Sequence, residues 1–149
     1  MKNTEKFFSD EPRTISSPEE MREFGACLST CLEAGDVIGL VGDLGAGKTH
    51  LVQGILRGLG AQDAGASPTF SLVHEHRDTT PAIAHFDLYR LSSPAEAVGM
   101  GWDEYLDSDS VLLVEWADRF DGELMPADTI WLVIKHQSEQ QRAVSLILP

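Results

Sequence analysis

Basic residues are scarce in this sequence, and they are dispersed. Its 149 residues include 11 Lys and Arg but 24 Asp and Glu, which gives a formal net charge of −13. No two basic residues are adjacent. Proteins that bind nucleic acid directly neutralise its phosphates with clustered Lys and Arg side chains. We therefore expect no direct binding to DNA or RNA, so any role with nucleic acid would require a partner that supplies the positive surface.

Long apolar runs are also absent. No stretch approaches the ~20 consecutive apolar residues of a membrane-spanning helix. The first residues, MKNTEKFFSDEPRT, mix charges early and contain no apolar block followed by a small-residue cleavage site, so they do not resemble a secretion signal. We expect a cytoplasmic protein with no membrane partner.

Cysteine is rare as well. Cys27 and Cys31 are the two cysteines, and they stand four residues apart on a predicted helix, so they should share one face. A closed zinc site would need two further ligands, and none lies nearby in the sequence. We predict that both cysteines are small buried core residues.

Capping signals and periodicity predict alternating helices and strands. The segment Ser17-Pro18-Glu19-Glu20 is typical of a helix start, because Ser caps, Pro suits the first position and Glu20 completes a capping box. The other predicted elements are a strand at 36–42, a helix at 48–59, strands at 69–76 and 82–88, a short helix from 93, a strand at 111–116, and a closing pair of strands at 129–136 and 142–148. This order predicts one α/β domain over residues 1–149, a mixed parallel and antiparallel sheet with helices packed on it, in which residues 1–16 are an N-terminal segment of uncertain order.

A glycine-rich loop separates the predicted strand at 36–42 from the helix at 48–59. Its residues GDLGAGKT, from Gly42 to Thr49, match the P-loop or Walker A motif, G-x4-G-K-[ST]. Glycines let backbone N–H groups curl around phosphates, while Lys48 can reach the outer phosphates and the Thr49 hydroxyl can coordinate Mg²⁺. The N-terminal end of the helix dipole adds to the attraction. The predicted nucleotide-binding residues of this P-loop NTPase-type domain are Asp43, Leu44, Gly45, Ala46, Gly47, Lys48, Thr49 and His50.

The missing asparagines favour adenine over guanine. Guanine-specific P-loop proteins usually recognise the base with an Asn-Lys-x-Asp segment, and Asn3 is the only asparagine in the chain. We therefore expect ATP, together with Mg²⁺, as the ligand.

Two acids compete for the support of the metal ion. P-loop enzymes need an acid at the end of a neighbouring strand. Glu115 ends VLLVE, which has the usual pattern of four apolar residues before an acid, whereas Asp87 ends the less apolar strand AIAHFD. A glutamate in this position can also orient the attacking water. The alternative for each is a solvated carboxylate at a strand end. Thr69, in the loop after the P-loop helix, is the hydroxyl predicted to sense the terminal phosphate, with a simple turn as the alternative. Trp116, next to Glu115, is either a core residue or a ring that responds to nucleotide.

Together these segments resemble one family. The segments GDLGAGKT, SPTF, HFDLYRL, SPAEAVGMGWDEYL and VLLVEWADR follow in this order at close spacing, from the first helix to about Ile134. The chain is similar to TsaE, the ATPase subunit of the bacterial system that makes threonylcarbamoyladenosine in tRNA. The resemblance implies that the protein docks on a TsaD–TsaB pair, which carries out the transfer, and that ATP hydrolysis resets this assembly between turnovers. Contact with tRNA would be indirect, through the complex.

The resemblance also implies roles for single residues. Residues 42–49 would form the phosphate cradle, in which Lys48 is catalytic. The metal site would comprise Thr49, Glu115, which serves the metal or its water, and Asp87, which supports it. Thr69 would belong to the nucleotide-sensing loop. His50 stands where many members carry a second hydroxyl residue, and we expect little loss because Thr49 already supplies the metal ligand.

Two other functions remain open. A small-molecule kinase on the same fold would clamp the migrating phosphoryl group, usually with several arginines in a lid, whereas Arg77, Arg90 and Arg119 are scattered along this chain. A non-hydrolysing adaptor would bind nucleotide and signal its presence through conformation alone. Release of the terminal phosphate as free phosphate would support the ATPase, and its transfer to a metabolite would support the kinase. The adaptor predicts that Glu115→Ala leaves the function of the complex intact, whereas the ATPase predicts a loss of turnover.

Overall fold

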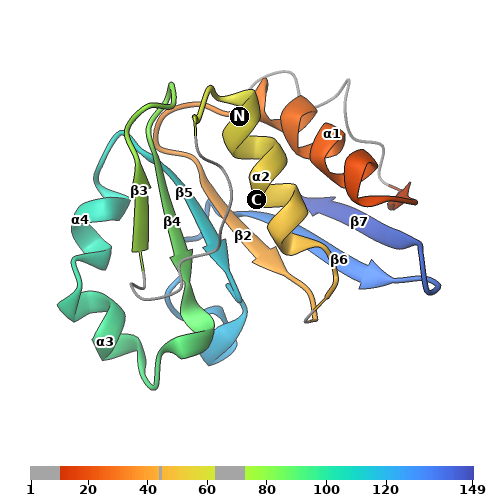
Figure 1. Cartoon of the computed structure of the whole chain (residues 1–149). Helices are drawn as coiled ribbons and strands as arrows, with labels where there is room; N and C mark the ends of the chain where they lie inside the picture. Colours follow the sequence, from red (N-terminus) through yellow and green to blue (C-terminus); the bar gives the residue numbers. More distant parts are fainter. Residues whose placement is uncertain (1–10, 44, 63–72) are drawn as a thin grey trace.

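The computed structural model describes residues 11–43, 45–62 and 73–149. Within them, the chain forms a seven-stranded sheet with the order β1-β7-β6-β2-β5-β4-β3 (Figure 1). The strands are β1 (Arg13–Ile15), β2 (Val37–Val41), β3 (Val73–His76), β4 (Ile83–Asp87), β5 (Val111–Glu115), β6 (Ile130–His136) and β7 (Arg142–Ile147); the helices are α1 (Pro18–Ser29), α2 (Lys48–Gly58), α3 (Pro94–Gly99) and α4 (Trp102–Leu106), with 3₁₀ turns η2 (Leu88–Arg90) and η3 (Arg119–Gly122). No helix in these ranges is long and apolar enough to cross a membrane.

The sheet is mixed, which confirms the predicted α/β class. The four central strands, β6, β2, β5 and β4, run parallel to one another, whereas β7 pairs antiparallel with β6 and β1, and β3 pairs antiparallel with β4. The antiparallel pairs β3–β4 and β6–β7 are the two pairs expected from the sequence, although residues 69–72 of the first predicted strand lie outside the described residues. Residues 13–15, within the segment of uncertain order, form β1 on β7.

Alternating residues of the central strands supply two separate cores. On β5, Val111 and Leu113 join the core beneath α1 and α2, whereas Leu112 and Val114 join the core that contains Trp102 of α4. In Figure 1, α1 and α2 lie side by side across β2, β6 and β7, and α3 and α4 lie on the β3–β4 side. Because side chains alternate along a strand, the residues of β5 that lie on the same face as Leu113, namely Val111 and Glu115, face the P-loop helix α2.

The predicted capping box forms at the start of α1 in a variant form, because Glu20 binds the N–H of Ser16 and not that of the N-cap Ser17. The prediction for the cysteines is wrong in part. The Ser17 hydroxyl accepts a hydrogen bond from the Glu20 backbone N–H at 3.1 Å, and the Glu20 carboxylate accepts one from Ser16 N–H at 2.7 Å. Helix α1 ends at Ser29, so Cys31 lies beyond it and the helical spacing no longer applies. As a result Cys31 is buried while Cys27 is exposed.

Glycines let α1 and α2 pack with their backbones in close approach. A Cβ built on Gly54 would overlap the backbone carbonyl of Arg22, and one on Gly58 would overlap the Ser29 side chain. Since the P-loop leads directly into α2, this packing fixes the direction in which the helix N-terminus points. Small residues at these contacts therefore support the geometry of the loop.

Replacing Gly54 with alanine should destabilise the protein by about 3 kcal/mol, because overpacking a close contact forces backbone shifts. Urea denaturation followed by circular dichroism measures the loss. The matched control is Gly99→Ala on α3, where an added Cβ would meet nothing within 4 Å; its stability should stay within about 0.5 kcal/mol of the parent. Equal stabilities for the two variants would contradict the close packing of α1 on α2.

Candidate functional site

The P-loop follows β2, the central parallel strand, and has a backbone path suited to glycine. Gly45 and Gly47 adopt positive φ values of 78° and 104°, in the left-handed region that disfavours other residues. A Cβ on Gly42 would lie 2.9 Å from the carbonyl oxygen of Ile134. Ala46 N–H donates to the Asp43 carbonyl at 3.0 Å, which closes a turn within the loop. The loop thus forms a tight concave backbone, of the kind that binds phosphate groups.

One cavity brings most of the predicted site together. Its volume is about 240 Å³, and it is lined by Gly45, Gly47, Lys48, Thr49, His50, Asp87, Glu115 and Trp116. Two predicted residues, Asp43 and Ala46, belong to the loop but do not line the cavity. Leu44 and Thr69 lie outside the described residues, so the phosphate-sensing role of Thr69 stays a prediction.

The two candidate acids are neighbours at the ends of adjacent parallel strands. Asp87 of β4 is in register with Glu115 of β5. Asp87 lies four residues after Ile83 and Glu115 lies two residues after Leu113, both of which belong to the core beneath α1 and α2, so the two carboxylates lie on the sheet face toward α2. Glu115 is 4% exposed, which makes the alternative of a solvated carboxylate wrong for this residue. Asp87 is half-buried, and burial raises its pKa, although a hydrogen bond from Tyr89 N–H at 3.0 Å opposes the shift. The two acids therefore differ in burial, because Glu115 is almost fully buried and Asp87 is half-buried.

A histidine that sequence analysis did not select contacts Glu115. Nε2 of His85 lies 2.7 Å from Oε2 of Glu115, and both side chains are buried. His85 stands two residues before Asp87, and a spacing of two places both on one face of a strand. That spacing and the place of His85 in the segment HFDLYRL were the available signals, since the partner lies 30 residues away.

The P-loop lysine is buried and is held within its own loop. Nζ of Lys48 donates a hydrogen bond to the Gly42 carbonyl and lies 3.7 Å from the ring centroid of Trp116. Burial lowers the pKa of the ammonium group, while the nearby carboxylates, Glu115 foremost, oppose that shift. Trp116 is only half-buried and has a positive φ of 57°, so it is a wall of the cavity rather than an ordinary core residue.

The donor set fits a magnesium ion bound together with phosphates. In the described ranges, no three His, Cys, Asp or Glu side chains cluster as a metal site by themselves. Two carboxylates and the Thr49 hydroxyl do line the cavity. Mg²⁺ usually keeps several waters and binds through one or two carboxylates plus substrate phosphates, so Asp87, Glu115 and Thr49 would suffice. The buried lysine and the glycine loop would hold the phosphates.

A second cavity adjoins the first along the P-loop. It has a volume of about 120 Å³ and shares Gly45, Gly47 and His50 with the first cavity; its other lining residues are Ile15, Ser17, Pro18, Met21, Ala46, Gln140 and Arg142. Nη2 of Arg142 donates to the Gly45 carbonyl at 3.4 Å. Sequence analysis missed Arg142, because nothing in the pattern of its strand indicates that β7 reaches the P-loop.

The raised pKa of Asp87 predicts a stability effect of its own. A carboxyl group whose pKa is raised by folding stabilises the fold at low pH and loses that contribution as pH rises through its folded pKa. Asp87→Asn should therefore raise the melting temperature of the metal-free protein at pH 7 by about 1–3 °C, a small effect because the group is half-exposed. The gain should vanish below the ordinary pKa of about 3.9. Calorimetry at both pH values checks this, with the exposed Asp128→Asn as control; a lower melting temperature at pH 7 would contradict it.

The comparisons with known proteins agree with one another. Residues 15–144 match the family model described as "Threonylcarbamoyl adenosine biosynthesis protein TsaE". The tRNA threonylcarbamoyladenosine biosynthesis protein TsaE of Bacillus subtilis (strain 168) is 36% identical over 133 residues, 89% of this chain and 82% of that protein. The protein of the same name from Haemophilus influenzae is 38% identical over 130 residues, 87% and 81% of the respective chains. The crystal structure of YdiB from B. subtilis superposes with a TM-score of 0.76 at 31% identity, covering 92% of this chain and 84% of that one.

Proposed function

This chain belongs to the TsaE family of threonylcarbamoyl adenosine biosynthesis proteins, and we propose that it acts in the cytoplasm as the ATPase subunit of that tRNA-modifying machinery. In this proposal it binds Mg-ATP in the cavity beside the P-loop and hydrolyses it to support repeated turnover of a TsaD–TsaB complex. The observation that carries the proposal is the convergence of a buried lysine and two carboxylates on one cavity at a glycine loop.

Each residue of the cavity has a chemical task in hydrolysis. The loop N–H groups and Lys48 bind the phosphate oxygens, and the ammonium group neutralises charge that develops during transfer. Thr49 and Asp87 would hold the magnesium ion, which would neutralise charge on the outer phosphates. Glu115 orients a water molecule and accepts its proton, as a buried carboxylate in hydrogen-bond reach can do. The adjoining cavity, lined in part by Ile15 and Met21, is the proposed position of the adenine ring.

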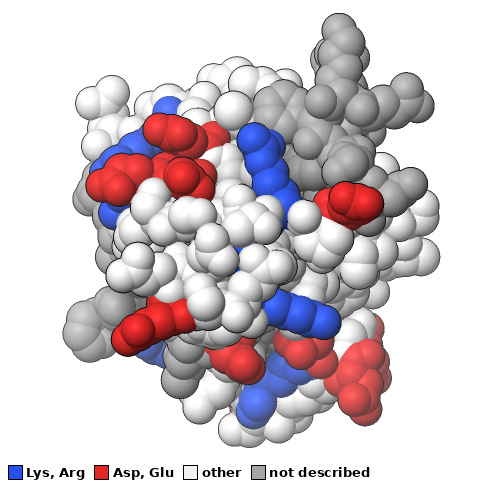
Figure 2. Space-filling model, turned by 90° about the vertical axis from the view of Figure 1, so that its right-hand side faces the viewer, with Lys and Arg blue, Asp and Glu red and all other residues white. Residues whose placement is uncertain are grey.

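The charge distribution favours a protein partner over direct contact with tRNA. On the face shown in Figure 2, Lys and Arg side chains lie among Asp and Glu side chains and form no continuous basic patch. With a net charge of −13, the chain would be repelled by a phosphate backbone. The TsaD–TsaB pair would therefore supply the surface that binds tRNA.

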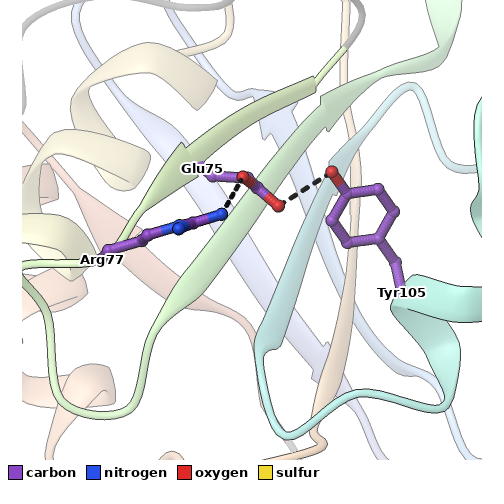
Figure 3. A network of polar contacts seen from close by, with 3 residues as sticks. All are labelled: Glu75, Arg77 and Tyr105. Atoms are coloured by element: carbon purple, nitrogen blue, oxygen red, sulfur yellow. Dashed lines mark hydrogen bonds and ion pairs between the residues drawn. The ribbon is translucent and has the colours of Figure 1, made fainter.

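The arginines argue against the small-molecule kinase. No Arg lines the 240 Å³ cavity among the described residues. Arg77 pairs with Glu75 at 3.2 Å, and Glu75 also accepts a hydrogen bond from Tyr105 (Figure 3). Glu75 and His76 pair with Ala84 and Ile83, so this network lies toward the end of β4 that is opposite Asp87. Arg119 donates to the Leu91 carbonyl. Among the described residues, Arg77 and Arg119 are thus engaged in contacts of their own, and Arg90 lies near enough to Asp87 to oppose the rise in its pKa.

The proposal is tested by following the terminal phosphate. Calorimetry of the purified protein should detect binding of Mg-ATP, and a phosphate-release assay should detect free phosphate, with a larger rate in the presence of TsaD and TsaB. Co-purification with and without ATP tests the partnership. Transfer of the phosphate to a metabolite would support the kinase instead, and the absence of any ATP binding by folded protein would overturn the proposal.

A further inference from the structure

We propose that His85 is a positioning residue, which fixes the Glu115 carboxylate through a buried hydrogen bond so that one of its oxygens is committed and the other faces the cavity. The inference rests on the proposed ATPase function, because it concerns how the proposed water-orienting residue is held. It assigns to the histidine of HFDLYRL a role that neither the P-loop motif nor the pair of acids explains.

The bond is short, and its surroundings are dry. Nε2 of His85 and Oε2 of Glu115 are 2.7 Å apart, with 1% and 6% of the respective side chains exposed. His85 lies on β4 in register with Leu113 and two residues before Asp87, so it is on the same sheet face as Asp87 and Glu115. It therefore occupies the layer between the apolar core and the carboxylates. A hydrogen bond to an ionised group in such a place is stronger than one in water.

The direction of the bond follows from the chemistry of the partners. An ionised carboxylate only accepts, so the imidazole must carry its proton on Nε2. Nδ1 is buried and has no hydrogen-bond partner among the residues that the structure describes. Glu115 is thus the one partner of this ring among the described residues, and a buried nitrogen without a partner destabilises the fold. A functional role for the bond to Glu115 would explain why that cost is tolerated. Filling the layer with an aliphatic side chain would avoid the cost.

The geometry also keeps Glu115 apart from Lys48. Opposite charges in a buried cavity attract strongly, yet Lys48 donates to the Gly42 carbonyl and faces Trp116 instead of pairing with Glu115. By holding Oε2 on the β4 side, His85 leaves Oε1 to orient water and keeps the carboxylate from pairing with the ammonium group, which is to bind phosphate. Without the imidazole, the carboxylate could rotate toward the ammonium group, and both would lose their alignment.

Three substitutions of His85 separate positioning from packing. The amide nitrogen of His85→Gln can take the place of Nε2, that of His85→Asn takes the place of Nδ1, and His85→Leu has no donor. We expect kcat for ATP hydrolysis to fall about 10- to 30-fold in the Asn and Leu variants, as for a lost charge-assisted hydrogen bond, with KM unchanged within about threefold. The Gln variant should recover activity to within about threefold of the parent. Exposed His136→Gln is the control.

Two further measurements do not depend on activity. Nitrogen NMR of imidazole-labelled protein should show His85 as the Nε2–H tautomer, and Glu115→Gln should shift its resonance while His136 stays constant. Nucleotide affinity, both in EDTA and with Mg²⁺, should stay within about threefold of the parent in all the His85 variants, because the proposed magnesium ligands are Thr49 and Asp87. If His85→Leu does not fold, the comparison of His85→Gln with His85→Asn still tests the positioning role.

The outcomes distinguish this inference from the function on which it rests. An Nδ1–H tautomer, or equal activity in the Gln and Asn variants, would overturn the positioning role. A further loss when His85→Leu is added to Glu115→Gln would also overturn it, because a residue that acts through Glu115 has no effect once that carboxylate is gone. Failure of the parent protein to bind or hydrolyse ATP would refute the proposed function, while NMR would still report the hydrogen bond.

Discussion

Lys48→Ala should lower the affinity for Mg-ATP about 100-fold while the affinity for AMP changes less than about threefold. The reason is the selective loss of charge-assisted hydrogen bonds to the outer phosphates, which contribute about 1.5–3 kcal/mol each; a factor of ten corresponds to about 1.4 kcal/mol. AMP lacks those phosphates, so it reports the rest of the site. Lys48 is 6% exposed and faces the cavity, and no other Lys or Arg among the described residues lines it.

Calorimetry for ATP and chemical-shift titration for AMP measure the two affinities. Lys135→Ala, which removes an equal charge from an exposed position on β6, is the matched control and should bind like the parent. Circular dichroism should show that the Lys48 variant is folded. Unchanged ATP affinity in the folded variant would remove Lys48 from the site, and an equal loss for ATP and AMP would indicate a damaged loop instead of a lost phosphate contact.

The fold was predictable where local chemistry determines it. Ser17 and Glu20 mark the start of α1 through backbone hydrogen bonds, and the apolar run of β5 requires a strand buried on both faces. The missed elements are short. Strand β1 has three residues and helix α4 has five, too few for a period to be recognised. They form because β7 and the core around Trp102 offer them partners, which is tertiary information.

The site residues were likewise predictable where the pattern is local and not where it depends on long-range contacts. The P-loop is contiguous, so its residues were found together, and the acids were found because parallel strands place their ends at one edge. His85 and Arg142 were missed, because their partners, Glu115 and Gly45, are 30 and 97 residues away. Sequence favoured Glu115 through its more apolar strand but left the division of roles between the two acids open, whereas the sheet shows that Glu115 is buried and Asp87 is half-exposed. Burial and long-range pairing are properties of the assembled sheet.

Glu115→Gln should lower ATP hydrolysis by about 100-fold or more while ATP affinity stays within about threefold of the parent. General-base assistance contributes about 10²–10⁴ in rate, and the amide cannot accept the proton from water. The substitution preserves shape, and its amide oxygen can still accept the hydrogen bond from His85, so the loss should be chemical and not structural. Single-turnover phosphate release measures the rate, and Glu123→Gln, at an exposed position, is the control.

The same variant decides between an ATPase and an adaptor. If nucleotide acts by its presence alone, Glu115→Gln should support repeated tRNA modification by TsaD and TsaB as well as the parent does, since ATP remains bound. If hydrolysis resets the complex, the variant should permit about one round per complex and then stop, because ATP stays in the cavity. A quench-flow count of modified tRNA per complex distinguishes the two. Sustained turnover with hydrolysis abolished would remove the ATPase step from the cycle and leave Glu115 as a ligand of the metal.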